Sequence, residues 1–141
     1  MEEINIMGTS IDCWIEYDEY NEVPFFDGGG DVLPLSSWSA LYGAKDYQIY
    51  SAIAGIRSKS KMLPLYKLRG QPENISTIII DEVHALSNVG WLTYSELMNA
   101  LEHANVDLKE VSLEFNSVIV LMSFFVEKIG EARVRLIFAI E

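Results

Sequence analysis

The sequence predicts an α+β fold, in which a small antiparallel or mixed sheet that includes both terminal strands packs against three to four helices. Residues 11–17 alternate apolar and polar side chains with a period of two, which is typical of a half-buried strand. Residues 133–140 are rich in β-forming side chains and predict a closing strand. Between these segments, several stretches have the caps and apolar spacing of helices. We therefore expect helices between two terminal strands that pair with each other.

Length and composition predict one domain over residues 1–141. Half of the 141 residues are hydrophobic, which is enough to bury a core without help from a metal or a disulfide. Cys13 is the only cysteine, and the start Met-Glu-Glu is unlike a secretory signal, so we expect a cytoplasmic protein. The longest apolar run, residues 118–126, is far shorter than the roughly 20 residues that span a bilayer. We therefore expect no membrane contact.

The segment after the first strand predicts a turn, a short strand and a loop. Residues 18–21 have turn composition, and residues 23–26 predict a second strand in which Pro24 requires an edge or a strand start. Residues 27–31, Asp-Gly-Gly-Gly-Asp, lack the Lys-Ser/Thr of a phosphate-binding loop and the context of a dinucleotide fingerprint. We interpret them as a loop.

The middle of the chain predicts a helix, a loop and a second element of ambiguous type. Asp46 is a suitable N-cap for a helix from Tyr47 to about Ile56. Residues 58–71 predict an exposed loop or short strand. Residues 77–86 favour a helix, but the three consecutive isoleucines at 78–80 leave a strand as an alternative.

Two further helices are predicted before the closing strand. Thr93 and Glu96 fit a capping box that opens a helix to about Ala104. Asn116 or Ser117 is the expected cap of a helix to about Ile129, which Gly130 ends. Because this last helix is apolar almost all round, we expect it to be the central helix of the fold.

A basic segment in an acidic chain is the best pointer to a site. The thirteen residues 57–69 contain five basic residues and no acidic one, so this segment carries +5. Subtracting +5 from the net charge of −11 leaves −16 for the remainder. A remainder of that sign repels long nucleic acid, whose affinity comes from phosphate neutralisation. A small anion is compatible with a local basic pocket.

The basic segment and the aromatic residues near it predict a site for a small phosphorylated ligand. Guanidinium groups bind phosphate through two N–H donors, lysines supply supporting charge, and aromatic rings stack a base. Trp14 falls on the polar face of its strand, where we expect it to be exposed. The residues that we expect to bind the ligand are Arg57, Lys59, Arg69, Tyr47, Tyr50, Trp91 and Trp14. The alternatives are a solvated loop and a homodimer in which this loop lies on the partner's acidic face.

Catalytic and metal-binding interpretations are weaker, and we expect no enzyme, no metal and no cofactor. Asp81 and His84 resemble half of a metal site, but His103 supplies no second half. Asp12 and Glu16 share a strand face and are candidates for an acid/base pair, although such carboxylates are commonly just solvated. Cys13 alternates inward with its apolar neighbours, which indicates a buried, inert thiol.

Five short segments follow one another along most of the chain: residues 10–16, 46–57, 69–76, 91–97 and 134–138. In this order they resemble a family of small uncharacterised proteins found largely in bacteriophages and bacteria. Family members tend to carry a His after the Asp of the first strand, where this chain has Cys13. The resemblance implies a phage or prophage setting, with host cytoplasm as the location.

Charge, aromatic content and this resemblance lead to one functional expectation. We expect a homo-oligomeric cytoplasmic protein that binds a nucleotide-like ligand, with sequestration of a nucleotide immune signal as the concrete form. The alternative is an interaction module that inhibits a host protein through Trp14, Trp38 and the basic segment. A nucleotide hydrolase that uses Asp12 or Glu16 is the third candidate.

Overall fold

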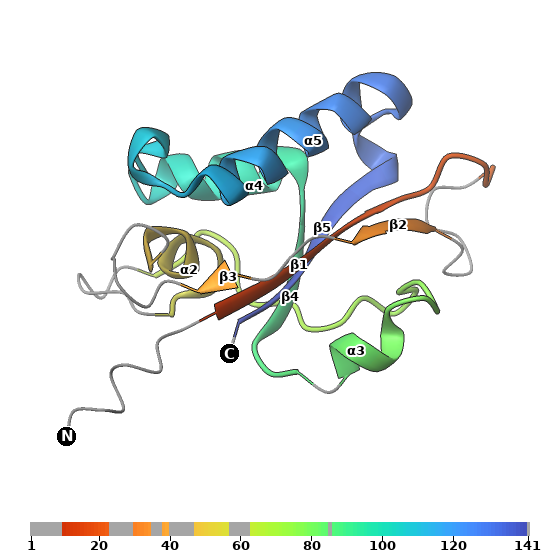
Figure 1. Cartoon of the computed structure of the whole chain (residues 1–141), viewed down its shortest axis with the longest axis horizontal. Coiled ribbons are helices and arrows are strands. Elements are labelled where there is room, and N and C mark those ends of the chain that lie inside the picture. The colour runs from red at the N-terminus through yellow and green to blue at the C-terminus, as the bar shows by residue number, and fades with distance from the viewer. Residues whose placement is uncertain are drawn as a thin grey trace.

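The computed structural model describes residues 10–22, 30–34, 38–39, 47–56, 63–84 and 86–140. It has the predicted α+β fold, with helices and a small antiparallel sheet that includes the strands nearest both ends of the chain (Figure 1). The strands are β1 (Ser10–Tyr17), β2 (Asp31–Pro34), β3 (Trp38–Ser39), β4 (Val89–Thr93) and β5 (Val134–Ile140). The helices are α2 (Tyr47–Ala54), α3 (Ile80–His84), α4 (Tyr94–His103) and α5 (Leu113–Ile129), with short 3₁₀ turns at Leu108–Glu110 and Glu131–Arg133.

The two terminal strands form the centre of the sheet. The order is β2-β1-β5-β4, and β3 pairs with the start of β1 on the same edge as β2. β1 and β5 pair antiparallel over seven residues, with Cys13 opposite Phe138. All seven residues of β5 are buried. The predicted pairing of the first and last strands is confirmed.

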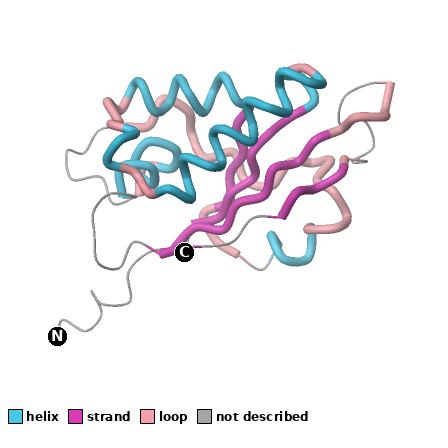
Figure 2. Tube along the Cα trace, turned by 45° about the horizontal axis from the view of Figure 1, so that its top comes forward, coloured by secondary structure: helices cyan, strands magenta, loops and turns pink. Residues whose placement is uncertain are grey.

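The sheet is the middle of three layers, because each of its faces is covered by other elements (Figure 2). On one face Ile15, Leu136 and Phe138 belong to the main core, which also takes in buried residues of α2, α4 and α5. On the other face Trp14, Ile137 and Ala139 form a second, smaller cluster with Ile75, Ile79 and Val83 of the segment that leads into and includes α3. Alternate residues of each central strand therefore enter different cores.

The structure corrects several predicted boundaries in the first half of the chain. Asp31, which the sequence pattern places in a loop, begins β2, and β4 is a strand that the pattern does not predict. The strand expected at residues 23–26, most of the glycine-rich loop and the expected cap Asp46 lie outside the described residues. The ambiguous segment 77–86 does contain a helix, but it is only Ile80–His84. Both β2 and β4 lie at sheet edges, where short strands carry weak sequence patterns.

The capping box at the start of α4 is confirmed, whereas the predicted cap of α5 is wrong. The Thr93 side chain accepts from the Glu96 backbone, and the Glu96 side chain accepts from the Thr93 backbone. α5 begins after Ser112, whose hydroxyl accepts from the Phe115 backbone, rather than after Asn116 or Ser117. Gly130 ends the helix with a φ of 95°, in the left-handed region that favours glycine.

α5 is not the central helix that its apolar composition predicts. One face is buried through residues such as Phe115, Val118 and Met122. The opposite face leaves Leu113 81%, Val120 66% and Phe124 51% exposed. The apolar content of a helix does not determine how many of its faces are covered by other elements.

No helix in the part of the chain that the structure describes is both long enough and apolar enough to cross a membrane.

Substitutions of two serines near the start of α5 test the assignment of its N-cap. We expect Ser112→Ala to lower the free energy of unfolding by about 1 kcal/mol, because the Phe115 N–H loses its acceptor. Ser117→Ala is the matched control, since its hydroxyl only donates to the Leu113 carbonyl, and we expect a change within about 0.5 kcal/mol. Urea unfolding measures both. A larger loss for Ser117→Ala contradicts the assigned cap.

Candidate functional site

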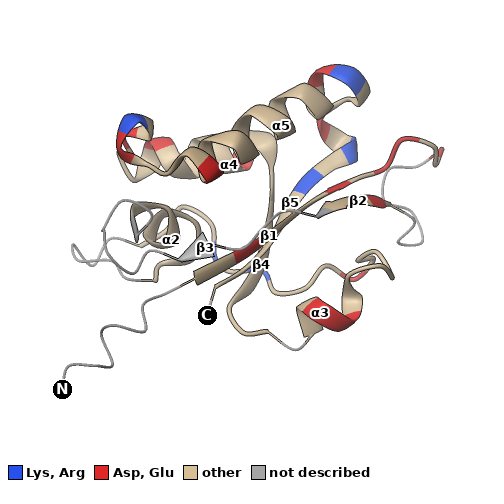
Figure 3. Cartoon of the chain, in the orientation of Figure 1, with Lys and Arg blue, Asp and Glu red and all other residues tan. Residues whose placement is uncertain are grey.

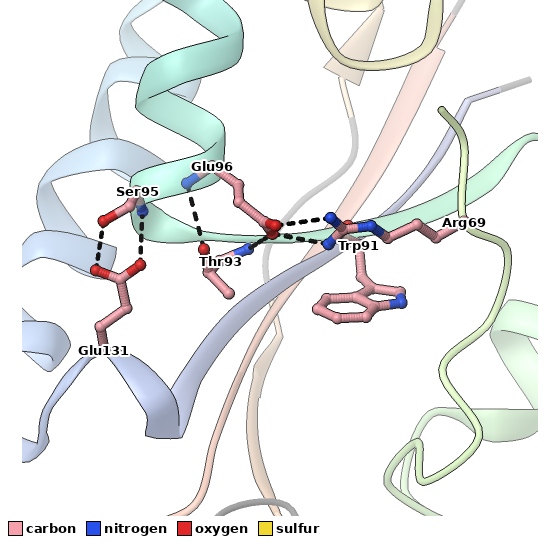
Figure 4. A network of polar contacts seen from close by, with 6 residues as sticks. All are labelled: Arg69, Trp91, Thr93, Ser95, Glu96 and Glu131. Atoms are coloured by element: carbon pink, nitrogen blue, oxygen red, sulfur yellow. Dashed lines mark hydrogen bonds and ion pairs between the residues drawn. The ribbon is translucent and has the colours of Figure 1, made fainter. Parts of the chain in front are cut away.

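The structure brings together two of the seven residues predicted to bind a ligand, Arg69 and Trp91. The Arg69 guanidinium carbon lies 4.5 Å from the centre of the Trp91 ring, and the same carbon lies 5.4 Å from the Tyr66 ring. Both distances are within the range of cation–π attraction. Figure 4 shows Arg69 lying alongside the indole of Trp91.

The other five predicted residues do not join this pair. Arg57 and Lys59 lie outside the described residues, and of Tyr47 only the place at the start of α2 is described. Tyr50 is fully buried in the main core. Trp14 is only 7% exposed, so the expectation of an exposed aromatic residue is wrong. At Trp14 the strand has no solvent face, because the α3 segment covers the side that the sequence pattern presents as polar.

Arg69 is held in place because its loop runs along the open edge of β4. The Gly70 N–H donates to the Val89 carbonyl at 2.8 Å, and Arg69 Nη1 donates to the Trp91 carbonyl at 3.4 Å. These bonds satisfy strand carbonyls that have no neighbouring strand. A Cβ on Gly90 would lie 2.8 Å from Leu68 and 2.7 Å from Phe138, so only glycine lets the loop approach this closely.

Glu96 fixes the orientation of the Arg69 guanidinium. Nη1 and Nη2 of Arg69 donate to the two carboxylate oxygens of Glu96 at 2.7 and 2.6 Å, a bidentate pair. The same carboxylate accepts the Thr93 N–H in the capping box (Figure 4). The Arg69 hydrogen bonds hold the pKa of Glu96 below its usual range. One carboxylate therefore joins the loop, the edge strand and the start of α4.

A second arginine, Arg135, approaches Trp91 from the centre of the sheet. Its guanidinium carbon lies 5.7 Å from the Trp91 ring centre, and the residue is 5% exposed. It pairs with Glu16, the residue directly opposite it on β1, and donates to the side chain and the carbonyl of Asn74 at 3.1 and 3.2 Å. The other Glu16 oxygen accepts the Ser76 N–H at 2.7 Å. Burial raises the pKa of Glu16, while the charge of Arg135 acts in the opposite direction.

A cleft of about 560 Å³ lies between the loop 69–74 and the sheet. It is lined by Arg69, Gln71, Pro72, Glu73, Asn74, Trp91 and Arg135. The two arginines are partnered by Glu96 and Glu16, and Glu73 adds a third carboxylate, so the net charge of the site is small.

Figure 3 shows acidic residues on α3 and in the turn after β1, and basic residues near the end of α5 and the start of β5.

Sequence reasoning missed Arg135, Glu96 and Asn74 as parts of this site. Arg135 did carry a signal, because a charged residue inside a strand of strong β-formers is unusual unless it has a buried partner. Glu96 was interpreted only as a capping residue. Its second role depends on where residue 69 lies, 27 positions earlier in the chain.

The structure shows the surroundings of several residues on which the catalytic and interaction alternatives depend. Glu16 is buried and holds Arg135 and the Ser76 N–H, which leaves it poorly placed to exchange protons with a substrate. Cys13 is buried, as predicted, and burial raises the pKa of its thiol. Trp14 is unavailable to a protein partner for the reason given above. Among the described residues, no three His, Cys, Asp or Glu side chains are grouped to hold a metal ion.

Comparison of the chain with protein-family models, with curated proteins and with solved structures finds no match in any of the three. The functional conclusion therefore depends on the geometry of the site.

The ion pair between Arg69 and Glu96 predicts a pH-dependent stability. Because the folded-state pKa of Glu96 is lowered, its stabilisation is complete above the unfolded pKa and is lost as pH falls through the folded pKa. We expect Glu96→Gln, which preserves the capping box, to cost about 1 kcal/mol at pH 7 and almost nothing at low pH. Urea unfolding across pH 2–7 measures this. The control is Glu102→Gln, an exposed position of the same helix, and equal pH profiles for both variants contradict the prediction.

The buried pair predicts a strong asymmetry between single and double substitutions. We expect Arg135→Met to lower the free energy of unfolding by about 3–5 kcal/mol, because Glu16 keeps a buried charge without its partner. Glu16→Met combined with Arg135→Met is expected to recover only part of that loss, because no unpaired charge remains but Asn74 and the Ser76 N–H still lose their partners. A loss below about 1 kcal/mol for Arg135→Met is the size expected for an exposed ion pair. Such a result contradicts the burial of the Glu16–Arg135 pair.

Proposed function

We propose that this protein binds a small phosphorylated ligand in the cleft beside Arg69, Trp91 and Arg135, and that it holds the ligand without transforming it. The observation that carries the proposal is the convergence of two arginines, 66 positions apart in the chain, on one tryptophan at the wall of a cleft. Clefts of about 300–1,000 Å³ are the usual size for small-molecule sites.

Arg69 and Trp91, which both line the cleft, supply the recognition surface in this proposal. Guanidinium and indole groups are planar, and a nucleobase would stack on them. The Arg69 side chain is 28% exposed, and its Nε–H has no hydrogen-bond partner among the described residues. This N–H is the proposed donor to a phosphate oxygen, and it leaves the bidentate pair with Glu96 intact. Gln71 and Asn74 add amide groups at the same wall.

The carboxylates around the cleft limit how much negative charge the ligand can carry. Glu16 and Glu96 each pair with one of the two arginines and neutralise its charge. Glu73 also lines the cleft, but it is not the partner of either arginine in these pairs. A ligand with one or two phosphate charges is therefore favoured over a polyphosphate or a long nucleic acid. In the phage setting that the family resemblance implies, sequestration of a nucleotide immune signal in the host cytoplasm is the concrete form of this function.

Isothermal titration calorimetry with a panel of ligands tests the proposal. The panel consists of adenosine, AMP, ADP-ribose, cyclic dinucleotides and inorganic phosphate. We expect at least one nucleotide to bind and adenosine to bind at least tenfold more weakly, because it lacks the phosphate. Trp91→Leu is expected to weaken binding about tenfold through the loss of stacking. Glu73→Gln is expected to strengthen it, because it removes a like charge from the cleft wall.

Lys67→Gln is the matched control, since it removes one positive charge from the same loop but does not line the cleft. Arg69→Gln removes the proposed phosphate donor and is expected to weaken nucleotide binding, and Lys67→Gln is expected to change the affinity less. Absence of heat with every ligand contradicts the proposed function, as does equal weakening by both substitutions.

A further inference from the structure

α5 presents an apolar stripe away from the core on its outer face. Leu113, Ser117, Val120 and Phe124 follow the spacing i, i+4, i+7 and i+11, which places them in one row along a helix. The buried residues Phe115, Val118, Ile119 and Met122 lie on the opposite side. The stripe therefore lies largely outside the core of its own chain, with three of its four side chains apolar and at least half exposed. Phe124 makes an edge contact with the Phe125 ring, 5.9 Å between ring centres.

The stripe itself carries no charge. The charged residues among the exposed positions of α5 are Glu114, Glu127 and Lys128, and none of them belongs to the stripe. A second copy can therefore meet the stripe of this acidic chain without burying a charge in the contact. We propose that α5 pairs antiparallel with α5 of a second copy, to form a homodimer with two-fold symmetry.

Two independent features place the two-fold axis near Leu121. Glu114 and Lys128 lie seven residues to either side of Leu121 and on the same flank of the helix, so an antiparallel pair sets each Glu114 beside the Lys128 of the other copy. Phe124 lies three residues to one side of Leu121. On the other side is a hollow of about 430 Å³, lined by Leu113, Asn116, Ser117, Val120 and Leu121.

The projecting ring and the hollow make the face self-complementary. In the antiparallel pair, Phe124 of each copy enters the hollow beside Ser117 of the other, and the contact is the same in both directions, as a two-fold interface requires. The Lys128 amine lies 5.5 Å from the Phe124 ring centre. The positive charge that pairs with Glu114 of the other copy therefore lies next to the ring that enters the hollow. The cleft beside Trp91 opens on the other side of the sheet and remains accessible in this dimer.

Sedimentation velocity over a concentration series tests whether the dimer exists. We expect wild type to be dimeric and Val120→Glu to be monomeric, because the substitution places two carboxylates near the axis. Val120 is 66% exposed, so the variant keeps its fold, and circular dichroism checks this. Ile78→Glu is the matched control, since Ile78 is 68% exposed just before α3, and it is expected to stay dimeric. A monomeric wild type, or a dimer that survives Val120→Glu, overturns the proposal.

Charge exchange and cross-linking test the antiparallel direction. Glu114→Lys and Lys128→Glu are each expected to weaken the dimer about threefold to tenfold, and the double exchange is expected to restore it. Val120→Cys is expected to form an intermolecular disulfide, whereas Leu113→Cys is not, because the two copies of residue 113 are about 24 Å apart along the helices. The native Cys13 is buried and does not interfere. Cross-linking at both positions indicates a parallel pair and overturns the proposed direction.

Discussion

The buried ion pair between Glu16 and Arg135 is the interaction on which the smaller layer of the structure depends. Taking both charges out of water is costly, and the cost is offset only when hydrogen bonds satisfy the rest of each group. Here Asn74 and the Ser76 backbone supply those bonds. The same bonds fasten the segment before α3 to the two central strands, so the second core and one wall of the cleft have a common anchor.

The Arg69–Glu96 pair performs a similar task at the edge of the sheet. An edge strand exposes carbonyls that invite pairing with another chain, and the loop around Arg69 satisfies two of them in β4. Glu96 then joins this loop to the cap of α4. The guanidinium groups of Arg69 and Arg135, each fixed by its ion pair, both contact the Trp91 ring, so contacts that stabilise the fold also hold this ring. In the proposed function this wall is preorganised, which would lower the entropy cost of binding the ligand.

The two proposed activities use opposite sides of the sheet. The cleft belongs to the layer that contains α3, whereas the exposed stripe of α5 belongs to the layer of larger helices. In the proposed dimer, this separation would leave the cleft of each copy accessible to the proposed ligand. The uncharged stripe of α5 would also let two acidic copies meet without burying a charge.

The sequence by itself determined the features that depend on local pattern. Alternation in residues 11–17 and β-formers in residues 133–140 predicted the two central strands, and the spacing of Thr93 and Glu96 predicted the start of α4. Only the tertiary structure decided which faces are covered. The α3 segment buries Trp14, α5 turns an apolar face outward, and Arg69 meets Trp91 and Glu96 across more than twenty residues. The physical reason is that periodicity reports which side chains share a face, while burial and pairing depend on what the rest of the chain places against that face.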